Sequence, residues 1–310
     1  MNELLAICIP TYNRSLILKE NLDNLISNYG IMNVNIYISD NASTDDTECV
    51  VKEAREKYPN IIYSKASENA GSSVNIERVL SMTQGENYAW LLGDDDTITG
   101  DISVIIEALK KQPLAVFLGN NENVSEGLYD GKSLLYDVRR ELSFMSAWII
   151  SKEVLDAAEF DRYRDTWFIH TGVVLDKSLI SGRKVQYLHN CWVKQEIGEG
   201  VRYRELGSRE FEVWREGYAK LITLLPIIPW KEKLEFIRAE GESKYRHDIV
   251  LLLNSKKNGY YTRQTREEYM RIFKLYHRKG GAIAALIVDL SPIRLINTLR
   301  PLYRKLRAKG

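Results

Sequence analysis

Short apolar runs alternate with amphipathic segments through the first 112 residues of the chain. The apolar runs are residues 4–9, 34–38, 61–63 and 88–92. After each run, apolar residues recur every three or four positions, which is typical of an amphipathic helix. The helices predicted in this way are residues 16–29, 45–58, 73–83 and 102–111. Repeated strand and helix units predict an α/β fold with a mostly parallel sheet flanked by helices.

Polar residues gather directly after each predicted strand. The four clusters are residues 10–14, 40–44, 68–71 and 93–96. In a parallel sheet the carboxyl ends of the strands meet at one edge, where such folds bind ligands. Helix capping explains residues such as Ser43, Thr44 or Asn69 separately, but it predicts no pattern shared by all four loops. The joint pattern therefore favours a binding site.

Three consecutive carboxylates, Asp94, Asp95 and Asp96, follow the fourth run. Burying three anions is costly unless a positive partner meets them. Side chains at i and i+2 of an extended segment project to the same side, so Asp94 and Asp96 are predicted to hold a hard divalent cation beside a phosphorylated substrate. The alternative is that the triplet only caps the helix predicted from residue 102.

Composition narrows the class of protein. With 310 residues, of which 45% are apolar and 27% charged, the chain is long enough for one large domain with an appendage, or for two domains. A net charge of +1 argues against a general nucleic-acid partner. The three cysteines, Cys8, Cys49 and Cys191, lie far apart, so a reducing cytoplasm is expected rather than a zinc site or a disulfide framework. The sequence shows neither a secretion signal nor an apolar run of about 18 residues, so neither secretion nor a membrane-spanning helix is expected.

The loops lack the glycine-rich motifs of dinucleotide-binding turns and of P-loops, so phosphate groups need another type of site. Four blocks instead resemble family 2 glycosyltransferases with the GT-A fold: IPTYNR at 9–14, ISDNASTDDT at 38–47, ENAG at 68–71 and WLLGDDD at 90–96. The second and fourth blocks are most similar to the abequosyltransferase-like subgroup of bacterial surface polysaccharide enzymes. The resemblance is strong over residues 1–112 and continues to about residue 192. It implies a GT-A catalytic domain over residues 1–208.

The resemblance implies a role for each matching residue. Pro10, Thr11 and Tyr12 would line the nucleotide base, with Arg14 nearby. Asp40 would accept a hydrogen bond from the base edge, Asn41 and Ser43 would complete that wall, and Asn69 and Gly71 would pass close to the nucleotide. Asp94 or Asp95 would contact the ribose. Asp96 would bind Mn²⁺ or Mg²⁺ at the diphosphate, where the metal neutralises charge on the leaving group.

The resemblance defines the catalytic base less well. Many inverting members begin a helix with a Glu-Asp pair shortly before a glycine and a strand. Gly182 and the run 184–188 match that glycine and strand, but counting back leads to His170 and Thr171. The nearest carboxylates are Asp165 and Asp161. Asp165 and His170 are the candidates for the base, with Asp165 favoured, although an imidazole suits base catalysis near neutral pH. The alternative for His170 is a structural role, and His189 is a candidate metal ligand.

From Glu210 onward the pattern is helical only. Helices are predicted at 211–225, 230–253 and 262–279, and they form a helical appendage over residues 209–310. The segment 282–290 is apolar, and the charges after Asp289 are all basic: Arg294, Arg300, Arg304, Lys305, Arg307 and Lys309. Such a segment is predicted to contact an anionic membrane surface. The alternatives are packing on the body of the protein or on a second subunit of a homo-oligomer.

Together these features predict a cytoplasmic, metal-dependent, inverting glycosyltransferase. It would move a sugar from a nucleotide-sugar donor to a glycan or lipid-linked acceptor, at the inner face of the cell membrane if the C-terminal segment binds lipid. A sugar-1-phosphate nucleotidyltransferase shares the architecture, but its glycine-rich basic signature is absent after the first strand. A non-catalytic scaffold with the GT-A shape is the third hypothesis, because the Glu-Asp pair is missing.

Overall fold

A computed structural model describes residues 3–29, 33–99, 101–189, 193–195, 211–241 and 244–291. The chain divides into two compact units, of which the first comprises residues 1–197 and 224–227 and the second residues 198–223 and 228–310. Within the described ranges, the strands all belong to the first unit, and the second unit contains helices and their connections. The domain boundary predicted between residues 208 and 209 lies outside the described residues.

The first unit contains a mostly parallel sheet, as predicted. Its eight strands are β1 (Leu5–Thr11), β2 (Asn35–Asp40), β3 (Ile61–Lys65), β4 (Tyr88–Leu91), β6 (Ala115–Gly119), β7 (Gly127–Tyr129), β8 (Trp148–Ser151) and β9 (Val185–His189). Their order is β3-β2-β1-β4-β8-β6-β9-β7. Strands β1 to β4 are parallel to their neighbours within this group, and β6 is parallel to β9. Strand β8 runs antiparallel between β4 and β6, which the sequence pattern does not predict.

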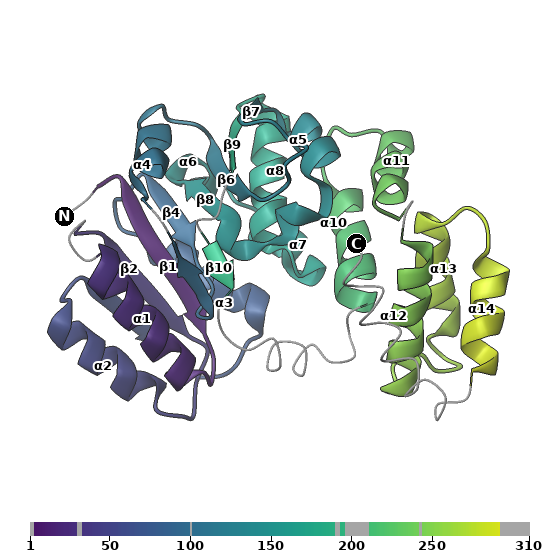
Figure 1. Cartoon of the computed structure of the whole chain (residues 1–310), viewed down its shortest axis with the longest axis horizontal. Helices are drawn as coiled ribbons and strands as arrows, with labels where there is room; N and C mark the ends of the chain where they lie inside the picture. The colour runs from purple at the N-terminus through teal and green to yellow at the C-terminus, as the bar shows by residue number, and fades with distance from the viewer. Residues whose placement is uncertain are drawn as a thin grey trace. The chain divides into compact units, whose positions relative to one another are not determined.

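Helices surround this sheet. They are α1 (Ser15–Tyr29), α2 (Thr47–Lys57), α3 (Ser72–Ser81), α4 (Ser103–Lys110), α5 (Gly131–Val138), α6 (Lys152–Asp156), α7 (Phe160–Tyr163) and α8 (Ile169–Ser181). Helices α1 and α2 lie side by side (Figure 1), whereas α3 packs on β1, β2 and α8. The first four strands and helices are confirmed within a few residues of their predicted bounds.

The order of the strands reverses at β1. The chain passes from β1 to β2 and β3 on one side, and then returns to place β4 on the other side of β1. Right-handed crossovers put the connecting helices on opposite faces when the direction reverses. The carboxyl ends of β1 and β4 therefore flank the crevice in which doubly wound sheets bind ligands.

Two buried tryptophans pack the centre of the sheet. The Trp90 indole donates a hydrogen bond to the Ser146 carbonyl (2.9 Å), and the Trp148 indole donates to the Leu142 carbonyl (2.8 Å). Phe117 meets Trp148 edge to face, with ring centroids 4.8 Å apart. Because Trp90 lies on β4, its indole holds Ser146 beside the end of that strand, where the acidic triplet begins.

The second unit consists of helices around a buried ion cluster. A π-helical segment, Glu212–Gly217, continues into α10 (Tyr218–Leu224), and α11 (Trp230–Gly241), α12 (Tyr245–Lys257), α13 (Arg266–Tyr276) and α14 (Gly281–Leu290) follow. The prediction of one helix over 230–253 is wrong, because α11 ends at Gly241. A side chain at Gly241 would start 2.8 Å from the Tyr276 Cβ, so this end of α11 packs closely on α13.

The ion cluster of the second unit joins three of its helical segments. The buried Arg215 guanidinium lies 2.6 Å from Asp248 Oδ1, and His277 Nε2 lies 2.8 Å from Asp248 Oδ2. Arg215 also lies over the Tyr276 ring, 4.9 Å from its centroid. None of the helices in the described ranges is both long enough and apolar enough to span a bilayer.

Candidate active site

The four polar loops meet at the carboxyl ends of β1 to β4. Thr11 is the register partner of Asp40, and the Thr11 carbonyl accepts a hydrogen bond from the Asn41 amide (3.0 Å). The Thr11 hydroxyl donates to Asp94 Oδ2 across the gap to β4 (2.7 Å). The structure thus brings the predicted residues of three separate loops together at the switch point of the sheet.

Arg14 connects the first loop with the acidic triplet. Its Nη1 lies 3.0 Å from Asp94 Oδ1 and 3.4 Å from Asp95 Oδ2. Burial raises the pKa of Asp94 to about 6, although the Arg14 charge opposes this shift. The Asp95 charge raises this pKa further. One guanidinium therefore partly compensates two buried carboxylates, and a further cation would be attracted here.

The backbone of the triplet is a turn and not an extended segment. The Asp96 amide donates to the Gly93 carbonyl (3.2 Å), and Asp96 begins the short strand β5 (Asp96–Ile98). The premise that Asp94 and Asp96 point the same way in an extended strand is therefore wrong. A methyl group added at Gly93 would lie 2.7 Å from Asp96 Oδ2 and 3.1 Å from Asp95 Oδ1. The two carboxylates that converge on one point are those of Asp95 and Asp96.

Ser146 holds Asp96 in this orientation. Its hydroxyl donates to Asp96 Oδ2 and accepts a hydrogen bond from the Gly93 amide (2.8 Å). On the other side of the turn, the Asn21 amide donates to the carbonyls of Gly93 (3.1 Å) and Asp94 (3.2 Å). Strand β10 (Val193–Gln195) pairs with β5 and returns the chain after β9 to the triplet.

His189 is not brought to the acidic triplet. It ends β9, which lies three strands from β4, roughly 14 Å away at about 4.8 Å per strand. Its backbone amide donates to Glu126 Oε1 (2.7 Å). No group of three or more His, Cys, Asp or Glu side chains in the described part of the chain is arranged as a metal site. A metal at the triplet would therefore need ligands beyond the protein carboxylates.

Asp40 is fixed by two hydrogen bonds at the end of β2. Its Oδ1 accepts from the Ser43 amide (2.7 Å), and its Oδ2 accepts from the Tyr63 hydroxyl (2.6 Å). Burial and the neighbouring Asp40 charge raise the pKa of Tyr63, so the phenol remains a donor. A carboxylate oxygen accepts more than one hydrogen bond, so Asp40 retains the capacity to accept one from a ligand.

The third loop is joined to the second by amide groups. Asn41 Nδ2 donates to Asn69 Oδ1 (2.7 Å) and to the Gly71 carbonyl (3.3 Å). The Ala70 amide donates to Asn41 Oδ1 (3.1 Å). Gly71 has φ 88°, a left-handed conformation that favours glycine, directly before α3. These contacts place Asn69 and Gly71 beside Asn41.

Tyr12 presents an exposed ring at this edge. The following residue is Asn13. Its backbone amide donates a hydrogen bond to the Ser43 hydroxyl (2.8 Å), and its side-chain Oδ1 accepts one from the Thr44 backbone amide (2.7 Å). The loop after β1 is thereby tied to the loop after β2. Tyr12 is 41% exposed, whereas Thr11, on the strand, is buried. An exposed aromatic ring beside ordered polar groups is suited to stacking on a nucleotide base.

Two polar residues of α3 support the site and are absent from the sequence prediction. Asn75 donates to the carbonyls of Thr11 (3.2 Å) and Ser39 (3.1 Å). Arg78 donates to the Asp40 carbonyl (3.1 Å). Asn75, like Asn21 in α1, occupies a buried position among the apolar residues of its helix. A polar residue on an apolar helix face is the signal that identifies such residues, whereas Ser146 carries no comparable signal.

The two candidates for the base lie in different environments. His170 is 2% exposed, and its Nε2 lies 3.3 Å from the Ser143 carbonyl oxygen. Burial lowers the pKa of His170 to about 4, so the imidazole is neutral near neutral pH. Asp165 is exposed on the 3₁₀ turn Arg164–Thr166. Asp165 is open to an acceptor hydroxyl from solvent, whereas the His170 ring is enclosed.

The turn that carries Asp165 is tied to α3. The Ser73 hydroxyl donates to the Arg164 carbonyl (2.9 Å), and Arg164 Nη2 lies 2.7 Å from Glu77 Oε2. Because α3 begins directly after Gly71, these contacts hold Asp165 near the edge that carries the nucleotide loops. The next residue, Trp167, is half-exposed and has φ 69°, an unusual conformation for a bulky residue that often marks a functional constraint.

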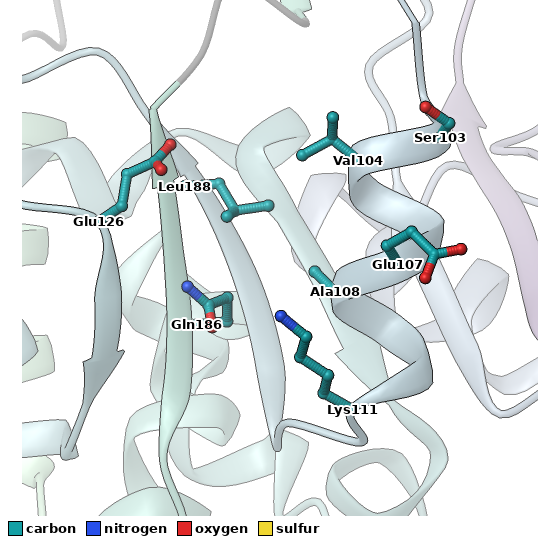
Figure 2. Close-up of a pocket in the computed structure, with 8 residues that line it drawn as sticks. All are labelled: Ser103, Val104, Glu107, Ala108, Lys111, Glu126, Gln186 and Leu188. Atoms are coloured by element: carbon teal, nitrogen blue, oxygen red, sulfur yellow. The ribbon is translucent and has the colours of Figure 1, made fainter.

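A separate cavity of about 360 Å³ lies between α4 and β9 (Figure 2). Val104 and Ala108 line it from α4, Lys111 lines it directly after that helix, and Gln186 and Leu188 line it from β9. None of the site residues predicted from the sequence lines this cavity. The edge of the sheet that joins the four loops, and not this cavity, is the candidate active site.

The fold and the acidic turn define this unit as a GT-A glycosyltransferase fold. Staphylococcus aureus TarS has a TM-score of 0.61 and 15% identity, covering 96% of this chain and 55% of TarS. The mannosyltransferase PcManGT from Pyrobaculum calidifontis, solved with GDP-Man and Mn²⁺, has a TM-score of 0.56 and 15% identity, covering 97% of this chain and 85% of that protein. At these identities the likeness shows the fold.

Residues 6–150 match the family model described as Glycosyl transferase family 2. The chain is 29% identical to abequosyltransferase RfbV from Salmonella typhimurium over 217 residues, which cover 60% of this chain and 64% of the relative. It is 28% identical to the GalNAc(5)-diNAcBac-PP-undecaprenol beta-1,3-glucosyltransferase of Campylobacter jejuni, covering 43% and 44%. The chain thus spans less than two thirds of these relatives. The predicted family is confirmed.

Proposed function

We propose that this protein transfers a sugar from a nucleotide-sugar donor to a glycan or lipid-linked glycan acceptor, as part of bacterial surface polysaccharide synthesis. The observation that carries the proposal is the convergence of Thr11, Arg14 and the acidic turn at the switch point of a family 2 domain. Two proteins of similar fold have been solved with nucleotide sugars: TarS with UDP-GlcNAc (TM-score 0.58) and PcManGT with GDP-Man. The Campylobacter jejuni relative is named for an undecaprenol-linked glycan, which supports a lipid-linked acceptor here.

The acidic turn fits a divalent cation. Asp95 and Asp96 direct carboxylate oxygens toward the space above Gly93, and Mg²⁺ and Mn²⁺ sites commonly combine one or two carboxylates with water and substrate phosphate. We assign Asp96 and Asp95 as the protein ligands. Asp94, predicted as a ligand, is instead held by Thr11 and Arg14 and would face the ribose. A bound Mn²⁺ or Mg²⁺ would supply Lewis-acid stabilisation of the departing diphosphate.

The remaining residues of the edge would hold the donor and activate the acceptor. Tyr12 would stack on the base, and Asp40 would accept a hydrogen bond from its edge. Asp165 would take the proton from the acceptor hydroxyl as that oxygen attacks the anomeric carbon, and the bond from this carbon to the diphosphate would break with inversion. His170 is buried, and its lowered pKa makes it a weaker base, so it would instead support the start of α8.

We place the reaction in the reducing cytoplasm. Cys8 is a buried free thiol and Cys49 an exposed one. An exposed free thiol persists where glutathione and thioredoxin keep cysteines reduced. This location also supplies the nucleotide-sugar donor that the proposed transfer consumes.

The donor can be identified by thermal stabilisation with a panel of UDP-, GDP-, CDP- and dTDP-sugars in the presence of Mn²⁺. A ligand that binds only the folded protein raises its unfolding temperature by mass action. Tyr12→Ala is expected to weaken binding of the stabilising donor by about 5- to 150-fold, because stacking on one base contributes about 1–3 kcal/mol. Titration calorimetry measures this loss.

The matched control is Tyr136→Ala, which removes another exposed tyrosine from α5. Donor affinity in this variant should equal that of the wild type. An absence of stabilisation by every nucleotide sugar would count against the transferase and in favour of a non-catalytic scaffold. Equal losses in the Tyr12 and Tyr136 variants would contradict the stacking role.

Replacing Asp165 with asparagine is expected to lower kcat by about 10²- to 10⁴-fold, because the amide cannot accept the acceptor proton. Donor affinity should stay unchanged, since Asp165 contacts the acceptor only. Steady-state kinetics with the donor identified above, together with calorimetric donor titration, separate the two effects.

Asp161→Asn provides the comparison for Asp165. Asp161 is an exposed acid that pairs with Arg164 one helical turn earlier. Its replacement should leave kcat within a few-fold of the wild type. A kcat for Asp165→Asn equal to that of Asp161→Asn would remove Asp165 as the base.

A further inference from the structure

An exposed apolar stripe runs along α14 of the second unit. Ile283 is 61% exposed, Leu286 58%, Ile287 41% and Leu290 71%. Their spacing of three, four and seven residues places them on one face of the helix. The opposite face, with Ala284, Ala285 and Val288, is buried, and α14 packs on α12 and α13. The apolar stripe (Ile283, Leu286, Ile287 and Leu290) therefore points away from its own unit.

Negative charge next to the apolar stripe is compensated. Asp289 is the one charged residue of α14, and its carboxylate accepts hydrogen bonds from Arg266 (2.7 and 2.8 Å) and Tyr261 (2.8 Å). At the C-terminal end of α14, Lys256 Nζ donates to the carbonyls of Val288 (2.7 Å) and Asp289 (2.9 Å). The one carboxylate of α14 is therefore neutralised by neighbouring groups.

The sequence after α14 is strongly basic. Residues 292–310 contain six arginine and lysine residues and neither aspartate nor glutamate. An apolar helix face followed in the sequence by a basic segment is the combination that binds anionic bilayers, because acyl chains accept the apolar residues and headgroups attract the cations. A second copy of this chain is a poorer occupant, because two chains with the same basic C-terminal sequence repel one another, whereas an anionic surface attracts it.

We propose that the apolar stripe of α14 is a docking surface for an anionic lipid bilayer. Its four large side chains enter the boundary between headgroups and acyl chains, and the basic residues that follow supply electrostatic attraction. This surface lies in the second unit and uses none of the residues proposed for sugar transfer. Membrane docking and transfer are therefore separate properties that separate measurements test.

The test measures cosedimentation of the full chain with phosphatidylcholine vesicles that contain or lack phosphatidylglycerol. The wild type should bind the anionic vesicles and release them at high salt, because salt screens the attraction. Leu286→Gln with Leu290→Gln should weaken this binding by about tenfold or more. A second double variant, Ile283→Gln with Ile287→Gln, should have the same effect. It serves as the test if the first double variant does not fold.

Ile180→Gln is the matched control, because Ile180 is a similarly exposed isoleucine on α8 of the first unit. This variant should bind vesicles as the wild type does, and donor-induced thermal stabilisation should be equal in all variants. Failure of the wild type to bind anionic vesicles, or equal binding by the stripe variants, overturns the proposal. A shift from dimer to monomer in the stripe variants, seen by light scattering, would assign the face to a second copy instead.

Discussion

Asp96→Asn is expected to lower sugar transfer by about 10³-fold while leaving the fold intact. The substitution removes the negative charge that would hold the cation at the diphosphate. It preserves the shape of the side chain and an oxygen that can accept the hydrogen bond from Ser146. Measuring kcat/KM across a Mn²⁺ titration, together with thermal unfolding, separates a loss of metal function from a loss of structure.

Ser146→Ala is the control for this experiment. It removes the hydroxyl that orients Asp96 and bonds the Gly93 amide but retains all three carboxylates. Transfer should fall far less than in Asp96→Asn, and added Mn²⁺ should recover part of it. Undiminished transfer by Asp96→Asn would falsify the assignment of this carboxylate to the metal.

Asp248→Asn is expected to destabilise the second unit by about 3–5 kcal/mol, because it removes the nearer anionic partner of the buried Arg215 guanidinium and leaves, among the described residues, only Glu240, 3.7 Å away. Chemical denaturation monitored by circular dichroism measures this loss. Asp289→Asn provides the comparison, since the Arg266–Asp289 pair is partly exposed and should contribute at most about 1 kcal/mol. Similar losses in the two variants would contradict the proposed importance of the buried cluster.

The same cluster predicts a pH dependence of stability. Burial alone would raise the pKa of Asp248, but hydrogen bonds from His247 and His277 and the Arg215 charge outweigh it and hold this pKa below its ordinary value. The stabilisation is therefore complete above the unfolded-state pKa of about 3.9 and is lost as the pH falls toward the lower folded-state pKa. Wild-type unfolding free energy should decrease below about pH 4, and this part of the decrease should be absent from Asp248→Asn.

Local patterns predicted the helices and strands of the first 112 residues well. Apolar periodicity depends on neighbours within a few residues, so it located β1 to β4 and α1 to α4 without knowledge of the fold. It did not predict that β8 enters the sheet antiparallel between β4 and β6, because strand pairing joins residues far apart in the chain. The interruption at Gly241 was also missed, since the close approach of Tyr276 is a tertiary contact.

In the candidate site, too, sequence motifs predicted some features and tertiary contacts decided the others. The four motif blocks located the loops that meet at the switch point, including Arg14 and the acidic triplet, and they identified the family. The pairing of Asp95 with Asp96 above Gly93 was not predictable from spacing, because a turn replaces the extended geometry on which the spacing argument depended. The support from Asn75 and Arg78 likewise requires α3 to pack on β1 and β2.

The sequence by itself determined the class of fold, the family and the loops that carry the chemistry, because these follow from local periodicity and from contiguous motifs. Only the tertiary structure decided which members of those motifs act together. It buried His170, left Asp165 exposed beside α3, and separated His189 from the acidic turn by the strands β8 and β6. The physical reason is that exposure, and distance across a sheet, depend on the order in which remote strands pair.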